Sequence, residues 1–129
     1  MKILTSGWLA LVLSPLGAQE IDYVAKGKET FGLWGCAECH VSSKDDNSIK
    51  TGPSLYNLFQ LQPRDRAVHD ATGKTQTVKA DRDYFLKSVR QPALHLAISE
   101  SGPTKGTAYP AIMPQFTPAL VSDSDLEMI

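Results

Sequence analysis

The chain has only two cysteines and three histidines among its 129 residues. A structural zinc site takes four such ligands, so the second cysteine pair of a four-cysteine site is missing. The formal net charge of −1 at pH 7 provides no basic field, which argues against a nucleic-acid partner. Aromatic residues make up 8% and charged residues 21% of the chain, a composition typical of one small globular domain.

Long hydrophobic runs are also lacking, and the apolar stretch near the N-terminus has the form of a secretory signal. One basic residue precedes the apolar segment 3–13, and residues 14–18 break the helix and end on small side chains. The stretch is shorter than the roughly 20 residues that a bilayer span needs, although an uncleaved anchor stays an alternative. We predict a bacterial signal peptide at residues 1–18, cleavage after Ala18, and a periplasmic or secreted protein.

The two cysteines are three positions apart, and a histidine directly follows the second, in the segment Cys36–His40 (CAECH). This spacing is typical of covalent attachment of a c-type haem. One helical turn can present both thiols to the vinyl groups at one edge of a porphyrin. The ring of His40 then lies next to the iron. We therefore predict haem c, with thioether bonds from Cys36 and Cys39 and with His40 as the proximal iron ligand.

Two other interpretations use the same cysteines. A thioredoxin-like redox pair normally follows a β-strand, whereas residues 27–35 have a helical pattern. A disulfide between Cys36 and Cys39 is chemically possible in an oxidising compartment, but it gives His40 no role.

Along the mature chain, residues 22–34 have the pattern of an amphipathic helix with Asp22 as N-cap, and its Gly27 indicates close approach by another element. A short helix is expected after Ser54. Residues 60–70 have no regular pattern, and Thr75–Val78 can form one arm of a small hairpin. Asp81 predicts the start of a helix that runs to about Gln91. Residues 93–112 have no periodicity and are expected to form a long loop over one face of the haem.

A second axial ligand decides between electron transfer and chemistry at the iron. Met113 lies in a proline-containing loop far along the chain, and we predict that it is the distal ligand. His95 is an alternative that would give two histidine ligands. Met128 is expected in the core and His69 at the surface. A thioether ligand favours Fe(II), so histidine–methionine ligation raises the reduction potential.

The mature chain, residues 19–129, resembles class I mono-haem cytochrome c domains over most of its length. The middle of the chain is similar to the cytochrome c domain fused to subunit II of some haem-copper oxidases. The matching segments are 25–31, 35–40, 51–55, 84–92 and 109–116.

The resemblance implies an all-α cytochrome c fold wrapped around one haem. It also implies that the Pro53 carbonyl accepts a hydrogen bond from His40 and that Tyr84 and Tyr109 contribute to the haem pocket. In this family a C-terminal helix crosses the N-terminal one. The sequence matches only the start of that helix, so we expect a truncated helix or a piece of a longer protein.

These features predict a one-electron carrier, not an enzyme, that works between a redox protein donor and an acceptor, with a membrane complex as a possible partner. Two alternatives stay open. The chain can be the N-terminal electron-input domain of a larger oxidase or dehydrogenase. If Met113 does not bind iron, the protein can be a haem peroxidase or a ligand-binding protein.

Overall fold

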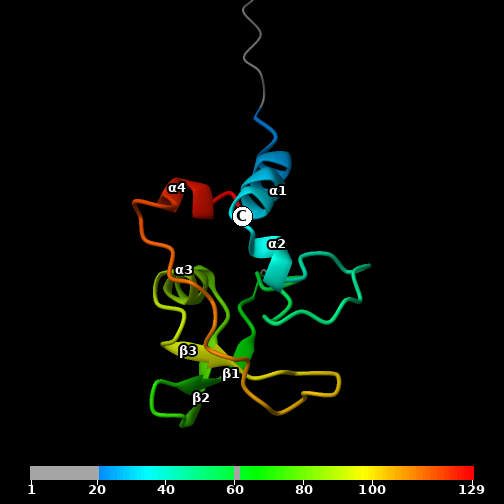
Figure 1. Ribbon diagram of the computed structural model, residues 1–129, viewed down its shortest axis with the longest axis vertical. Coiled ribbons are helices and arrows are strands. Elements are labelled where there is room, and N and C mark those ends of the chain that lie inside the picture. The colour runs from blue at the N-terminus through cyan, green and yellow to red at the C-terminus, as the bar shows by residue number, and fades with distance from the viewer. Residues whose placement is uncertain (1–20, 60–61) are drawn as a thin grey trace, which may run out of the picture.

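The computed structural model describes residues 21–59 and 62–129, and the predicted signal peptide at residues 1–18 lies outside these ranges. In the described ranges the elements follow the order α1 (Tyr23–Leu33), α2 (Cys36–Cys39), β1 (Asp65–Asp70), β2 (Thr75–Lys79), α3 (Arg82–Arg90), β3 (His95–Ala97) and α4 (Asp123–Leu126) (Figure 1). None of the helices within these ranges has both the length and the apolar character of a membrane span.

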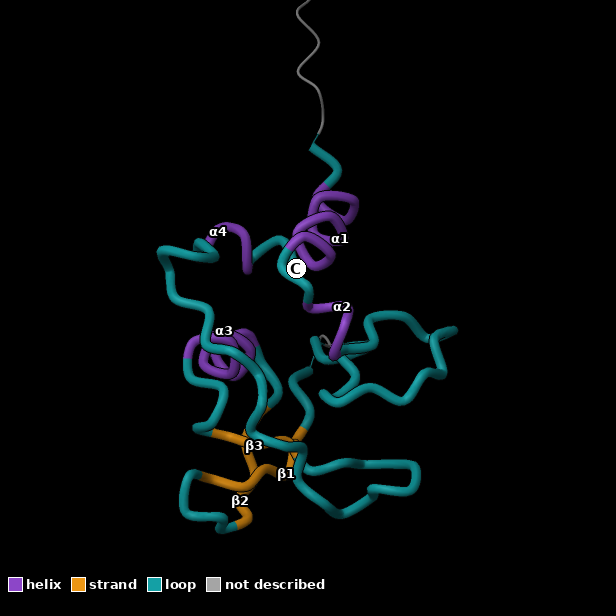
Figure 2. Tube along the Cα trace, in the orientation of Figure 1, coloured by secondary structure: helices purple, strands orange, loops and turns teal. Residues whose placement is uncertain are grey.

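The prediction of an all-α fold is wrong. Helices make up 26% of the described residues, strands make up 15%, and loops connect short elements over the remainder (Figure 2). The strands form an antiparallel sheet in the order β2-β1-β3. Residues 60–70 have no regular sequence pattern and residues 93–112 are predicted to form a loop, whereas the structure places β1 and β3 in these two ranges.

The hairpin of β1 and β2 is the local part of this sheet. Its register pairs Arg66 with Val78 and Val68 with Gln76, and a turn of residues 71–74 joins the strands. Gly73 in the turn has a φ of 81°, a conformation that glycine adopts at low cost. The predicted hairpin arm at Thr75–Val78 is therefore confirmed as β2.

The two longer helices begin where their capping residues predict. Asp22 accepts a hydrogen bond from the Ala25 backbone N–H at 3.0 Å, and Asp81 accepts one from the Tyr84 N–H at 2.8 Å. Helix α3 buries the three residues of its inward face, Tyr84, Phe85 and Val89. The short helix expected after Ser54 does not form, and turns occupy that segment.

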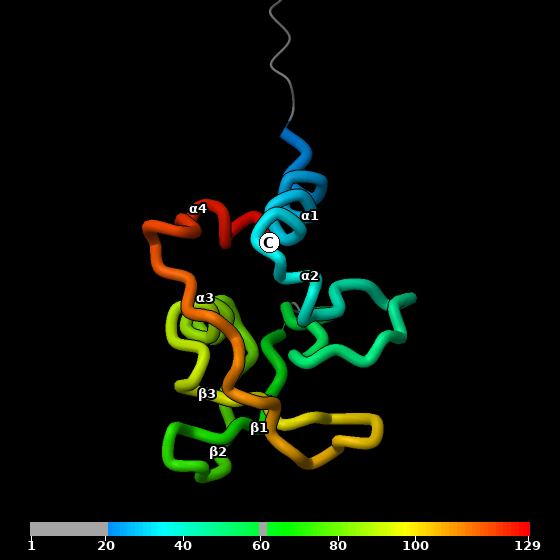
Figure 3. The backbone as a smooth tube through the Cα atoms, viewed as in Figure 1, coloured from blue at the N-terminus to red at the C-terminus, as the bar shows by residue number. Residues whose placement is uncertain are grey.

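The C-terminal segment packs directly against α1. Figure 3 shows the end of the chain, in red, beside the blue helix. The contact centres on Gly27, where an added Cβ would lie 1.9 Å from the backbone oxygen of Met128. Gly27 thus permits close approach of another element, as its position in the sequence predicts. Helix α4 itself is a single turn of four residues, capped by Ser122.

Substitution of Gly27 by alanine is expected to destabilise the protein by about 1–3 kcal/mol or more. The new methyl group would overlap the backbone of Met128, which cannot rotate away as a side chain can. Thermal or denaturant unfolding measures the effect. Gly32→Ala, in the same helix, is the matched control, because a Cβ there meets nothing within 4 Å. The control should stabilise by about 0.5–1 kcal/mol through helix propensity. Equal effects of the two substitutions would contradict the close packing of the Met128 backbone against Gly27.

Candidate functional site

An apolar cavity is lined by residues of α1, α2, α3, the sheet and the segment 109–116. It contains about 1300 Å³ of space, including the part that is open to solvent. Every candidate site residue named from the sequence contributes to its lining: Cys36, Cys39, His40, Pro53, Tyr84, Tyr109 and Met113. These residues come from four separate segments of the chain, so the fold brings together what the sequence predicted as one site.

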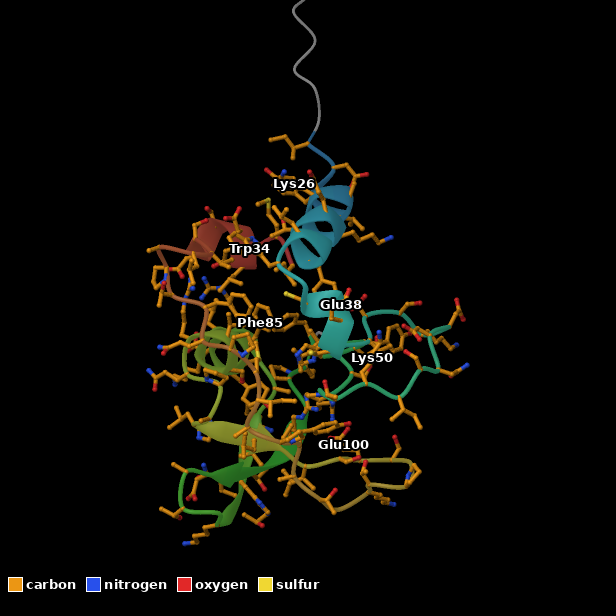
Figure 4. The ribbon with its side chains drawn as sticks, in the orientation of Figure 1. Lys26, Trp34, Glu38, Lys50, Phe85 and Glu100 are labelled. Carbon is orange, nitrogen blue, oxygen red and sulfur yellow. The ribbon has the colours of Figure 1, made fainter. Side chains whose placement is uncertain are left out.

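The cysteines lie on α2, a single helical turn that directly follows α1. Gly35 precedes this turn with a φ of 70°, which lets the chain change direction after α1. The Lys50 ammonium lies beside α2 in Figure 4 and donates a hydrogen bond to the Ala37 carbonyl oxygen at 3.1 Å. Both cysteines are free thiols and half-buried at the cavity wall. The α2 turn therefore presents both sulfurs to the cavity.

The environment of the thiols differs from that of a redox-active pair. Burial raises the pKa of Cys36 above its ordinary value, and the neighbouring Cys39 adds to the rise, while a backbone hydrogen bond opposes it. Reactive redox cysteines instead have a lowered pKa. A helix leads into the motif where a thioredoxin-like site has a strand. The site therefore favours the protonated form of the Cys36 thiol.

His40 follows the cysteines and is held by the backbone of residues 52–53. Its Nδ1 lies 2.8 Å from the Pro53 carbonyl oxygen, which is the contact that the resemblance implies. Gly52 packs against the ring next to this bond, where an added Cβ would lie 2.5 Å from Cε1 and 2.8 Å from Nδ1 of His40. The Gly52 backbone N–H also donates to the Cys39 carbonyl oxygen at 2.9 Å. Residues 52–53 thus fix the imidazole and leave Nε2 as its free nitrogen.

The protonation state of His40 suits a metal ligand. Burial lowers the pKa of the imidazole, the Arg66 charge lowers it further, and the hydrogen bond to Pro53 opposes both effects. The ring is therefore neutral at neutral pH, the form that coordinates metals. A partner on Nδ1 orients a ligating imidazole and makes it a stronger donor.

Substitution of Gly52 by alanine is expected to displace the His40 ring and to weaken its bond to Pro53, because the new methyl group occupies the space of Cε1. A loss of about 1–3 kcal/mol in stability should accompany the change. NMR detection of a protected Nδ1–H proton measures the hydrogen bond, and Gly32→Ala serves as the glycine control in open space. An unchanged imidazole signal in Gly52→Ala would show that the ring is not held there.

The segment 109–116 forms another wall of the cavity. Met113 is partly buried and packs against the hydrophobic core, and Tyr109 is tied to β3 by its backbone N–H, which donates to the Ala97 carbonyl oxygen at 2.9 Å. His95, in β3, also lines the cavity, so it stays a geometric competitor of Met113. His69 lies elsewhere on β1, and Met128 contacts α1.

Arg66 is a charged lining residue that the sequence patterns do not predict. It lies on the buried face of β1, is 4% exposed, and its Cζ lies 6.0 Å from the centre of the Tyr84 ring. Arg90, another cation near the core, is instead bound to the Phe116 carbonyl oxygen and to Asp123. The alternation of buried and exposed residues along β1 would have pointed to Arg66, but it is visible only once that segment is assigned as a strand.

Other metal chemistry has little support in this part of the molecule. No group of three or more His, Cys, Asp or Glu side chains that could hold an ion occurs within residues 21–59 and 62–129. The candidate iron ligands are one histidine and one methionine, a set that holds iron in c-type cytochromes when the porphyrin supplies the remaining nitrogens.

Comparison with known proteins gives little guidance. No protein-family model matches the chain, and no solved structure matches it. A region of 69 residues, 53% of the chain, is 32% identical to the DDB1- and CUL4-associated factor homolog 1 of Arabidopsis thaliana. The chain spans only 4% of the length of that protein. The site must therefore be interpreted from its own residues.

Proposed function

We propose that the protein is an exported c-type cytochrome, a one-electron carrier with a covalently bound haem. One observation carries the proposal: the two cysteines of a haem-attachment motif, the histidine after them and a distant methionine line the same apolar cavity. In the sequence, the evidence for haem attachment is the spacing of the two cysteines and the histidine. The cavity adds a place for a flat apolar cofactor beside it.

Each residue of the site has a distinct task in this proposal. Cys36 and Cys39 would anchor the cofactor through thioether bonds, and the neutral His40 would supply a ligand to its iron. Pro53 orients the imidazole through its carbonyl oxygen, and Gly52 leaves room for the ring. Met113 would supply the second protein ligand, and its soft sulfur would favour the reduced metal.

Apolar residues back the cavity. Phe85, Val89 and Leu126 belong to the buried core and also line the cavity (Figure 4 labels Phe85). Bound haem would supply the one-electron couple. Two protein ligands on the iron would limit access of small molecules to the metal, which suits electron transfer rather than turnover of a substrate.

The proposal depends on the site and not on the fold. The three-stranded sheet and the short helices do not match the all-α architecture that the resemblance implied. Function is determined by the geometry and chemistry of a site, and the same chemistry occurs on different folds. The partners of the carrier would be a redox protein donor and acceptor outside the cytoplasm, either as free proteins or as parts of one membrane complex.

Spectroelectrochemical titration of the mature, haem-loaded protein tests the carrier function. A carrier should give a reversible one-electron transition, the near-red band of a Met-ligated ferric haem, and slow reaction with carbon monoxide and cyanide. Fast binding of these ligands to the untreated protein would instead support a peroxidase or a ligand-binding protein and would refute the carrier.

A further inference from the structure

Arg66 is a buried cation in an otherwise apolar cavity. The exposed fraction of this residue is 4%, and it shares the inner face of β1 with Val68, which is fully buried. Arginine is rarely buried without a partner, because the removal of its charge from water is costly. Its position therefore needs an explanation that the core packing does not provide.

The described residues, 21–59 and 62–129, provide no adequate partner for this guanidinium. Within residues 21–59 and 62–129, its Nε is buried and has no hydrogen-bond partner. The ion pairs in these ranges all involve other basic residues. The Tyr84 ring lies 6.0 Å away, at the outer limit of a cation–π contact, and it accepts no hydrogen bond from Nε.

The cavity walls also lack the acid that would pair with Arg66. None of the residues that line the cavity in the described part of the chain is Asp or Glu. A buried arginine with free donors is suited to a carboxylate, because its planar group offers several N–H donors. The complementary anion must therefore enter with the ligand of the cavity.

We propose that Arg66 binds a propionate carboxylate of the haem and thereby orients the cofactor and raises its reduction potential. This inference rests on the proposed function. The pair would neutralise a negative charge close to the iron, in a cavity of low dielectric constant. Without that compensation the carboxylate would stabilise the ferric state, so the potential would fall.

The test compares haem-loaded Arg66→Gln, Arg66→Lys and Arg64→Gln with the unmodified protein. Arg64 is a matched control, because it pairs with Glu100 at 2.6 Å and does not line the cavity. The readouts are the reduction potential and the absorption spectrum. We expect Arg66→Gln to lower the potential while the Met-ligation band is retained. Arg66→Lys should restore part of the loss, and Arg64→Gln should leave the potential unchanged.

Equal potentials in the unmodified protein and in Arg66→Gln would overturn the inference. So would equal shifts in the Gln and Lys variants, since these would indicate a role in packing. If Arg66→Gln yields no haem-loaded protein, recovery of loaded Arg66→Lys supports the charge pair, and failure of both variants contradicts it. Absence of haem from the unmodified protein would instead refute the proposed function itself, a separate result.

Discussion

Replacement of both Cys36 and Cys39 by serine is expected to abolish covalent attachment of haem. Serine is close to cysteine in size, but its hydroxyl does not form the thioether bonds. The thiols lie on one short turn at the cavity wall, and each single variant should keep one bond to the cofactor. Intact-protein mass spectrometry and haem staining after denaturing electrophoresis measure the attachment, and the pigment of the double variant should be extracted by acidified organic solvent.

Glu38→Gln is the matched control for the cysteine variants. Glu38 lies between the two cysteines on α2, is exposed, and does not line the cavity. This variant should carry haem at the level of the unmodified protein. A double serine variant that retained covalent pigment would show that attachment occurs at other residues.

Replacement of Met113 by alanine is expected to cause the largest change in the redox properties. If Met113 is the thioether ligand, as proposed, alanine removes it, so the near-red band of the ferric protein should disappear and the reduction potential should fall steeply. Axial ligands set haem potentials over a range of about 0.8 V. The open iron face should then bind carbon monoxide and cyanide rapidly.

Two other variants show whether Met113 is the ligand. Met128→Ala removes a methionine outside the main cavity, and His95→Ala removes the histidine that lines it. Both variants should keep the near-red band. Loss of iron ligation in His95→Ala together with a normal Met113→Ala would identify His95 as the distal ligand and would reject the assignment of Met113.

The local signals in the sequence predicted the parts of the fold that depend on neighbouring residues. Caps at Asp22 and Asp81 mark the starts of α1 and α3 to the residue. The turn around Gly73 predicts β2 in the same way. Val24 shows the limit of periodicity, because it lies three and seven residues before the buried Gly27 and Phe31, on the same helix face, and is nevertheless 68% exposed.

The fold class could not be predicted from such signals. Strand β3 has only three residues, and the residues of β1 with which they pair lie more than twenty positions earlier in the sequence. Residues 65–70 alternate in burial only in the context of that sheet, and their charged composition hides the pattern. The all-α expectation therefore came from the resemblance and failed where long-range pairing determines the structure.

The candidate site was more predictable than the fold. The spacing of Cys36, Cys39 and His40 is a local chemical pattern, and the proline residues around Met113 restrict that loop. Arg66 could not be found this way, because its significance is that it is buried and that its Nε has no hydrogen-bond partner in the part of the chain that the structure describes. Only the three-dimensional structure shows which cations lie inside and which, like Arg90, are paired.

The mass of the mature chain, purified from a host that attaches haem to exported proteins, tests the central claim most directly. We expect the mass of the polypeptide plus one haem, with a pigment that stays with the protein in acidified organic solvent. A colourless protein with the mass of the polypeptide alone, or a pigment that the solvent removes, would contradict the account.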